Sequence, residues 1–551
     1  MTPRPTDVRA GLPLLAVLAV AGLVTSASTS REAASAKTAP VAAGPLRSAD
    51  AAVVDGPLAA RWAEASIDPA EPAADLEILR RAWLALAGTI PSVEEIRRFE
   101  ADAGRDRLDR WIDGLLAERR VADHLARRFA RAFVGRVDGQ FIVFRRDRFT
   151  DWLAERLHAN EPFDRVVTSM VADRGLWTES PAVNFVTQAM ANDDLDTTVL
   201  AGRVSRALLG MRLDCAQCHD HPFAPYTQAQ YEGLAACFGQ VRVTALGVED
   251  DPARVLAIDL PPAPDGGAGP RAMQPRTRKI PPRVPFGAEW WTDGGSHREN
   301  LAAWIVDPRN RRFHRAVVNR AWGIVFGRPW HEPADDLPDP PGVPDDDPLD
   351  RLAGDFCDHG CDLRRLLATL TRSRLFRLSS RHPLRGDEAG DRRVDEAWAA
   401  YPITPAPPET LITAMVQATS LRTIDRDSHL LTRTIRFFRE VDFLRDYGVT
   451  EDANGRHETT TVPQALVRMN GRLAREMVEA NPFTAPGRIA GFASDDERRV
   501  ELACLGILTR RPSAAERTAL AHVVAAAPSR DRGLEDLFWV LMNSAEFGWN
   551  H

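Results

Sequence analysis

Residues 82–95 of the chain read AWLALAGTIPSVEE, which has the pattern of one helix ending and another beginning. Leu76, Leu79, Trp83 and Leu86 recur at intervals of three and four residues. This spacing places apolar side chains on one face of an α-helix. The segment therefore predicts an amphipathic helix that begins near Leu76.

The second helix of this corner is predicted by its first turn. The Ser92 side chain can accept a hydrogen bond from the backbone of Glu95, whose carboxylate can reach back to the backbone of Ser92, which makes a capping box. Helical spacing continues at Leu108, Trp111 and Ile112. Further helices are expected over residues 121–134, 146–159, 163–173, 195–212 and 227–239. Strand-like alternation is rare, so the sequence predicts a mainly α fold with little β structure.

The chain has 551 residues, of which 44% are hydrophobic, so it can bury more than one core. Prolines and glycines crowd residues 246–295, which predicts a linker or a long ordered loop between two helical domains. The expected organisation is a signal peptide over residues 1–28, an Ala/Pro-rich spacer over 29–70, an N-terminal helical domain over 71–245, the Pro/Gly-rich segment over 246–295, and a C-terminal helical domain over 296–551. The spacer is expected to be disordered or loosely packed.

Two smaller features stand out. Residues 503–516 (ACLGILTRRPSAAE) align without gaps on residues 82–95, although any helix–Pro–helix corner has this pattern, and we favour that simpler interpretation over a duplication. Residues 332–348 (EPADDLPDPPGVPDDDP) are acidic and proline-rich. They are expected to form a solvated loop, with a calcium site as the alternative.

The N-terminus has the features of an export signal. Arg4 and Arg9 precede an apolar run over residues 11–24, and small residues follow at 26–28. We therefore expect a periplasmic or extracellular protein, with an N-terminal membrane anchor as the alternative and no membrane span beyond this signal. The net charge of −7 and the absence of a basic run argue against a nucleic-acid partner.

The motif with the clearest chemistry is Cys215-Ala216-Gln217-Cys218-His219. Cys-x-x-Cys-His is the attachment pattern of c-type haem. Two thiols on one turn can bond the two vinyl groups of a porphyrin, and the next residue presents an imidazole to the iron. The sequence therefore predicts a covalent haem c held by Cys215 and Cys218, with His219 as the metal ligand.

Zinc and a disulfide are the alternatives at this motif. Zinc could use the motif with His221, but closed zinc sites usually draw ligands from two separated segments, and Cys357 and Cys361 could supply the second pair. Oxidation of the motif's own two cysteines would instead give a redox or structural disulfide. Cys357 and Cys361 are otherwise expected to form a local disulfide or to lie as buried thiols, and Cys237 and Cys504 to be core residues.

A haem would need a second set of residues around it. Apolar walls are expected from Phe223, Leu234 or Phe238. The candidates for a second axial ligand are Met273, His297 and His314, and a five-coordinate haem is the alternative. The aromatic side chains of Trp290, Trp291 and Trp330 could bind sugar, but core packing is the default expectation.

Several motifs resemble one known family. Residues 203–218 (RVSRALLGMRLDCAQC), followed by HDHPF at 219–223 and YTQ at 226–228, resemble the signature of the secreted planctomycete cytochrome-like family, which carries paired domains of unknown function 1549 and 1553. Later motifs similar to that family are FHRAVVNRAWGIVFG at 313–327 with EP at 332–333 and DD at 335–336, TVPQAL at 461–466, and LMNSAEF at 541–547. The resemblance implies export and a cytochrome-like role, but it transfers no catalytic residues. Many members carry a separate cytochrome-c-like domain, which this chain lacks because it has no second Cys-x-x-Cys-His motif.

The function favoured at this point is an exported c-type haem-binding protein in electron transfer or redox chemistry, with a redox protein as its partner. The alternatives are a haem- or metal-dependent extracytoplasmic enzyme acting on a polymer, and a structural or binding protein with zinc or a disulfide at the motif. No Ser-His-Asp set or phosphate loop is evident, so whether the chain is an enzyme stays open, as does its oligomeric state.

Overall fold

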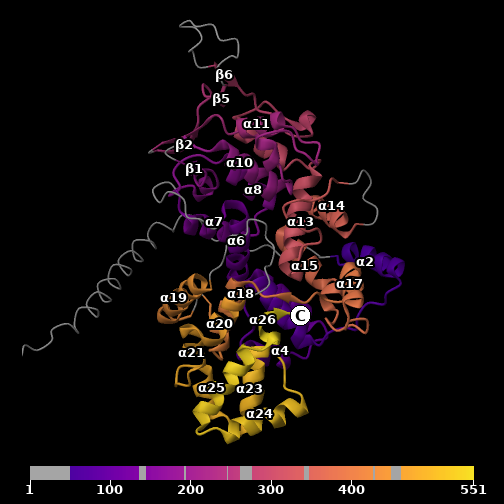
Figure 1. Ribbon diagram of the computed structural model, residues 1–551, viewed down its shortest axis with the longest axis vertical. Coiled ribbons are helices and arrows are strands. Elements are labelled where there is room, and N and C mark those ends of the chain that lie inside the picture. Colours follow the sequence, from indigo (N-terminus) through magenta and orange to yellow (C-terminus); the bar gives the residue numbers. More distant parts are fainter. Residues whose placement is uncertain are drawn as a thin grey trace, which may run out of the picture. The chain divides into compact units, whose positions relative to one another are not determined.

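The computed structural model describes residues 50–135, 144–191, 194–244, 246–260, 276–340, 347–425, 428–447 and 461–551. These residues form many helices and only two-stranded sheets, which confirms the predicted mainly α class (Figure 1). The predicted signal peptide lies outside the described residues. Within the described ranges, no helix combines the length and apolar character that crossing a membrane requires.

The first half of the chain follows the expected helical pattern closely. Its helices are α2 (Ala52–Ala65), α3 (Asp75–Ala82), α4 (Val93–Ala101), α5 (Arg107–Ala117), α6 (Arg119–Val134), α7 (Arg146–His158), α8 (Phe163–Ala172), α9 (Asn184–Thr187), α10 (Thr197–Arg203) and α11 (Gln228–Ala236). Shorter helical segments are η1 (Trp83–Ala87), η2 (Pro181–Val183), η3 (Val204–Leu208) and η4 (Asp214–Gln217). The helices predicted over 121–134, 146–159, 163–173 and 227–239 are confirmed, and the one over 195–212 only in part.

Helices also dominate the second half. They are α12 (His297–Ile305), α13 (Arg311–Phe326), α14 (Pro348–Asp358), α15 (Leu363–Arg372), α16 (Arg374–Arg377), α17 (Glu388–Ala397), α18 (Pro408–Ala418), α19 (Leu430–Asp446), α20 (Val462–Asn470), α21 (Arg472–Val478), α22 (Ala485–Phe492), α23 (Asp496–Leu508), α24 (Ala514–Ala526), α25 (Arg530–Met542) and α26 (Ala545–Gly548).

The strands form four antiparallel pairs. These are β1 (Met190–Ala191) with β2 (Asp194–Leu195), β3 (Val241–Thr244) with β4 (Gly247–Asp250), β5 (Ala257–Leu260) with β6 (Arg276–Lys279), and β7 (Thr404–Pro405) with β8 (Trp549–Asn550). Strands β4, β5 and β6 and the short helix η6 (Ala288–Trp290) fall within the proline-rich segment 246–295. The described part of that segment is therefore an ordered connection.

The corner at residues 82–95 forms as predicted. Ser92 accepts a hydrogen bond from the backbone N–H of Glu95 at 3.1 Å, and Glu95 accepts one from the backbone N–H of Ser92 at 2.8 Å. Gly88 turns the chain with a φ of +63°, and a Cβ there would lie 2.1 Å from Nδ1 of His124. The aligned corner ends α23 with Thr509, also left-handed at φ 57°, and starts α24 with a second capping box.

One expectation for the N-terminal spacer is wrong. Residues 52–65 are not loosely packed but form α2, in which Val54, Leu58 and Trp62 are buried. These side chains recur every four residues, so they share one helix face. Trp62 also donates a hydrogen bond from its ring N–H to the carbonyl of Ala397 at 3.1 Å, which ties the helix to a distant part of the chain.

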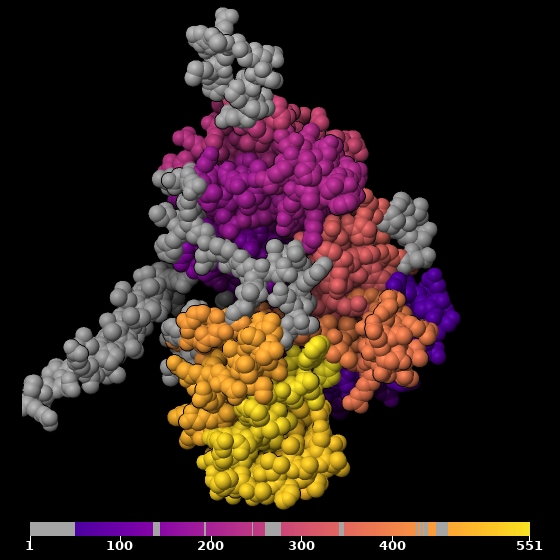
Figure 2. All heavy atoms as spheres, in the orientation of Figure 1, coloured from indigo at the N-terminus to yellow at the C-terminus, as the bar shows by residue number. Residues whose placement is uncertain are grey.

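The buried apolar residues fall into two clusters. The first runs from Val54 to Tyr401 and includes Leu505. The second covers residues 411–547, the orange to yellow part of Figure 2, and also takes in residues from the corner near Ile90. Because α12 packs on α8 and α13 packs on η1 and η3, residues on both sides of the proline-rich segment share the first cluster. The core therefore does not divide at residues 246–295.

Candidate functional site

The chain approaches the cysteine motif through an interrupted helix. Asp196 caps α10 by accepting hydrogen bonds from the backbone of Thr198 and Val199 at 2.9 and 3.1 Å. The helix then widens into the π-helix η3 and stops, because Gly210 takes a left-handed conformation with a φ of +60°. The predicted helix over 195–212 therefore ends early, and the chain turns outward to the motif.

The two motif cysteines lie on one turn. Residues Asp214–Gln217 form the 3₁₀ helix η4, in which side chains three apart lie above one another, so Cys215 and Cys218 share one side. Asp214 pairs with Arg206 at 2.7 Å, and Ala216 is fully buried beneath the turn. Both thiols are free and exposed. The ion pair and the buried Ala216 side chain thus hold the inner side of the turn, and its two sulfur atoms face solvent.

The histidine that follows is oriented by its own loop. Nδ1 of His219 lies 2.7 Å from the carbonyl oxygen of Asp220. A carbonyl can only accept a hydrogen bond, so Nδ1 carries the proton and Nε2 of the neutral ring carries the lone pair. The Asp220 carboxylate in turn accepts a hydrogen bond from the backbone of Gln228 at 2.8 Å, which ties the loop to the start of α11. The imidazole is exposed.

The apolar walls expected around the motif are not formed by the predicted residues. Phe223 is 95% exposed at the tip of the loop, whereas Leu234 and Phe238 are fully buried in the first cluster. Leu234 and Phe238 are four residues apart and face the core together. The prediction that they would line a slot is therefore wrong, and the motif lies on the surface.

The other cysteines are placed apart from the motif. No group of three or more His, Cys, Asp or Glu side chains within the described ranges is arranged to hold a metal ion, so Cys357 and Cys361 do not complete a four-ligand set. All six cysteines are free thiols. Cys237 and Cys504 are core residues, as predicted, and burial raises the pKa of each thiol to about 12.

The candidate axial ligands lie between residues 273 and 314. Met273 lies outside the described residues. His297 begins α12, while His314 is buried in α13 with Nδ1 3.1 Å from the carbonyl of Asn310. Burial lowers the pKa of His314. His314 is thus a packed core residue.

The three tryptophans considered as a sugar platform pack against the core. The ring of Trp330 stacks on that of Trp398 at a centroid distance of 5.4 Å, and the Arg61 guanidinium lies 5.3 Å from the Trp330 centroid. Trp290 and Trp291 pack against the first cluster. The default expectation of core packing is confirmed.

Comparison with protein-family models divides the chain into two matched regions. Residues 53–243 match a family described as "Protein of unknown function (DUF1549)", and residues 297–432 match one described as "Protein of unknown function (DUF1553)". The chain carries these two domains in tandem. The cysteine turn lies inside the DUF1549 region. No curated protein and no solved structure matched the chain.

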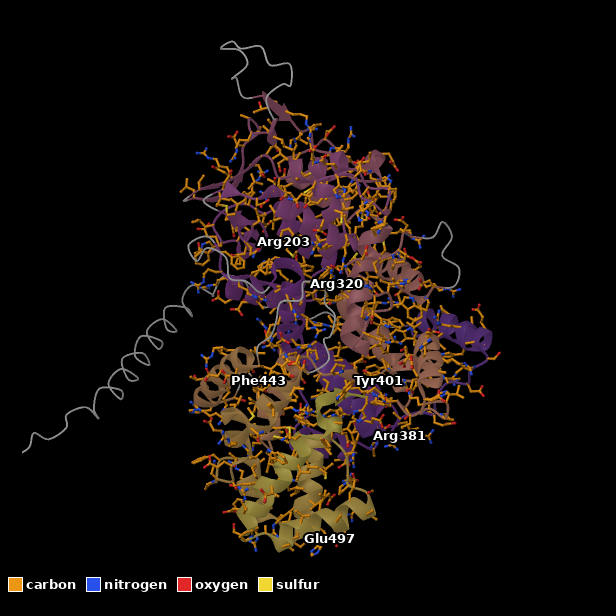
Figure 3. All side chains as sticks on the ribbon, in the orientation of Figure 1. Arg203, Arg320, Arg381, Tyr401, Phe443 and Glu497 are labelled. Atoms are coloured by element: carbon orange, nitrogen blue, oxygen red, sulfur yellow. The ribbon has the colours of Figure 1, made fainter. Side chains whose placement is uncertain are left out.

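Contacts between the two matched regions surround the turn, and sequence reasoning missed them. Arg320 in the DUF1553 region donates hydrogen bonds to the carbonyls of Arg206 and Ala207 at 3.0 and 3.2 Å, and so caps the end of η3 (Figure 3). The described start of the acidic stretch, residues 332–340, is not simply a solvated loop, because Asp335 and Leu337 are buried against the DUF1549 region. The only sequence signal for these contacts was the resemblance of Asp335-Asp336 to a motif of the family.

Proposed function

We propose that the chain is an exported redox protein that carries one haem c, attached to Cys215 and Cys218 with His219 as an axial ligand. When bound, haem c supplies one-electron transfer chemistry. The observation that carries the proposal is the exposed turn, on which two free thiols and an imidazole with an available Nε2 follow one another.

The donor set fits this group well. Thioether attachment needs two accessible thiols at a fixed spacing, and the 3₁₀ turn presents both on one side. The hydrogen bond from Nδ1 of His219 to the carbonyl of Asp220 selects the ring tautomer, as is usual for metal-binding histidines. The ion pair between Arg206 and Asp214 holds the base of the turn. These residues would bind and orient the group.

The surface position of the turn bears on the partner. Because Leu234 and Phe238 face the core, the chain covers little of a group attached here, and a partner can approach closely. We infer that electrons pass directly to a second redox protein at this face. The export signal predicted over residues 1–28 places the chain in the periplasm or outside the cell, where haem c is attached, and the planctomycete cytochrome-like family has the same expected location.

Covalent attachment can be tested directly. The chain is produced with its own signal in cells that carry the haem-maturation machinery, and the intact mass and the spectrum after denaturation are measured. We expect a haem band that survives unfolding, because thioether bonds do. The double variant Cys215→Ala/Cys218→Ala should lose the band, and Cys237→Ala should keep it. A mature chain without added haem mass would refute the proposal.

A second candidate function follows from the missing apolar walls. Two exposed thiols three residues apart can act as a reversible dithiol. In that reaction Cys215 and Cys218 lose two protons and two electrons to form a disulfide, and a partner disulfide gains both and becomes two thiols. Titration of the haem-free chain in glutathione buffers would show a two-electron transition that Cys218→Ala abolishes. A turn that stays reduced in every buffer excludes this candidate.

A further inference from the structure

Residues 335–339, which we call the strap, run beside the loop that bears the cysteine motif. The strap follows α13 in the DUF1553 region, whereas the loop, residues 209–227, belongs to the DUF1549 region. Asp335 and Leu337 are only 8% and 5% exposed, so these two strap residues are packed, while Asp336, Pro338 and Asp339 face solvent. It contacts the loop at two places that lie on either side of the motif.

The first contact precedes the motif. The backbone N–H of Leu337 donates to the carbonyl of Gly210 at 2.8 Å, and the Leu337 side chain covers Gly210 so closely that a Cβ there would lie 2.8 Å from it. Two residues on, Arg212 donates to the Asp335 carboxylate at 2.8 Å. Both backbone and side chain therefore hold the chain where it leaves η3.

The second contact follows the motif. The Tyr226 hydroxyl donates to the Asp339 carboxylate at 3.4 Å and accepts from the Arg312 guanidinium at 3.2 Å, while Arg312 also pairs with Asp339. The carbonyl of Tyr226 accepts from the backbone of His221 at 2.8 Å, which closes the tip of the loop. Arg312 is 5% exposed in α13, so it is a rigid support.

A third set of bonds holds the strap itself. Arg315, also buried in α13, donates to the carbonyl of Pro338 at 2.7 Å. The strap is thus fixed to α13 through Pro338 and Asp339, and to the loop through Asp335, Leu337 and Asp339. Between Arg212 and Tyr226 lies the exposed turn.

We propose that the strap positions the Cys215–His219 turn, so that the redox turn of the DUF1549 region is completed by the DUF1553 region. The inference rests on the proposed function only for the chemistry at the turn. It gives a physical reason why the DUF1549 and DUF1553 regions occur together. The turn has little buried surface of its own, and the residues on either side of it are held by a segment more than a hundred residues away in the sequence. Asp335, Leu337 and Asp339 act as positioning residues and touch no reacting atom.

The test uses the full chain, produced without haem attachment and kept reduced. Hydrogen exchange is measured in Leu337→Ala and Asp335→Asn, with Glu388→Gln as the matched control because it removes the partner of an exposed ion pair on α17. Opening of the loop in the first two variants should speed exchange at residues 210–227 by about tenfold or more, while residues 75–130 exchange as in the parent. Glu388→Gln should change neither segment.

A chemical readout separates positioning from simple packing. In glutathione buffers the Cys215–Cys218 equilibrium should shift about threefold or more toward the disulfide in the strap variants, because a loosened turn can bring the sulfurs to bonding distance with less strain. In Asp335→Glu the Cys215–Cys218 equilibrium should be that of the parent protein, because a carboxylate still lies opposite Arg212. Unchanged exchange at 210–227, or an equal loss of protection along the whole chain, would overturn the inference. None of these measurements depends on haem, so its absence would leave this result intact.

Discussion

Cysteine and histidine occur in two contrasting settings in this protein. On the surface turn, Cys215, Cys218 and His219 are exposed, and the histidine bonds only to a neighbouring carbonyl. Inside the core, Cys237 is fully buried and His124 is 6% exposed beneath Gly88. The residue types are the same, but solvent access separates side chains that can react from side chains that only fill space.

The largest expected difference is in thiol reactivity. Burial raises the pKa of Cys237, Cys361 and Cys504 to about 12, so at pH 8 about one molecule in ten thousand carries each thiolate. In the folded, reduced, haem-free chain, iodoacetamide should modify these thiols about 100-fold or more slowly than Cys215 and Cys218. Peptide mass spectrometry over time measures the rates. In denaturant all six should react alike, and rapid labelling of Cys237 in the folded chain would contradict the contrast.

The buried histidine should make stability depend on acidity. Burial holds the pKa of His124 well below its ordinary value, so the folded state stays neutral where the unfolded state binds a proton. Its stabilising contribution is complete above about pH 6.5 and is lost as the pH falls below that value, by up to about 1.4 kcal/mol per pH unit. Urea unfolding at several pH values should show that the free energy of unfolding falls less steeply with decreasing pH in His124→Gln than in the parent protein. Equal slopes in parent and variant would show that His124 does not carry this effect.

Replacing a buried cysteine by alanine should lower the free energy of unfolding more than replacing an exposed one. Cys237 fills the core and donates a hydrogen bond from its thiol to the carbonyl of Gly233 at 3.5 Å. Cys237→Ala should lower the free energy of unfolding by about 1–2 kcal/mol, because it leaves a cavity in the core and removes the thiol hydrogen bond. Cys215→Ala should change it by less than about 0.5 kcal/mol. Urea midpoints of the haem-free variants measure both, and equal losses would be inconsistent with the structure.

The smallest expected effect is at the exposed histidine. His219 bonds only to the carbonyl of Asp220, so His219→Gln should shift the free energy of unfolding by less than about 0.5 kcal/mol. If haem is attached through the cysteines, the same variant should keep the covalent band but alter its spectrum. A destabilisation of several kcal/mol would mean that the imidazole supports the loop rather than a ligand.

Local signals in the sequence predicted the parts of the fold that depend on near neighbours. The capping box joins Ser92 to Glu95, three residues apart, and the corresponding helix forms. The mainly α class and most helix positions followed from spacing within one or two turns. The Cys-x-x-Cys-His motif likewise lies on one turn, because residues three apart fall on the same side of the 3₁₀ helix η4.

Predictions of features that depend on distant contacts were wrong, or were not made at all. Helix α2 was expected to be a loose spacer, yet Trp62 is anchored to the carbonyl of Ala397, 335 residues away. The helix over 195–212 was expected to continue, yet Gly210 turns the chain under Leu337. Leu234 and Phe238 have the spacing of a buried face, but spacing does not say whether that face meets a cofactor or the core.

By itself, the sequence determined the mainly helical class, the capped corner and the identity of the two thiols and the imidazole on one turn, because each depends on bonds and rotations within a few residues. Only the tertiary structure decided that this turn is exposed, that its apolar neighbours face the core, and that the strap holds it. Those outcomes depend on which surfaces meet after folding, and residues 212 and 335 or 226 and 339 have no local pattern that links them.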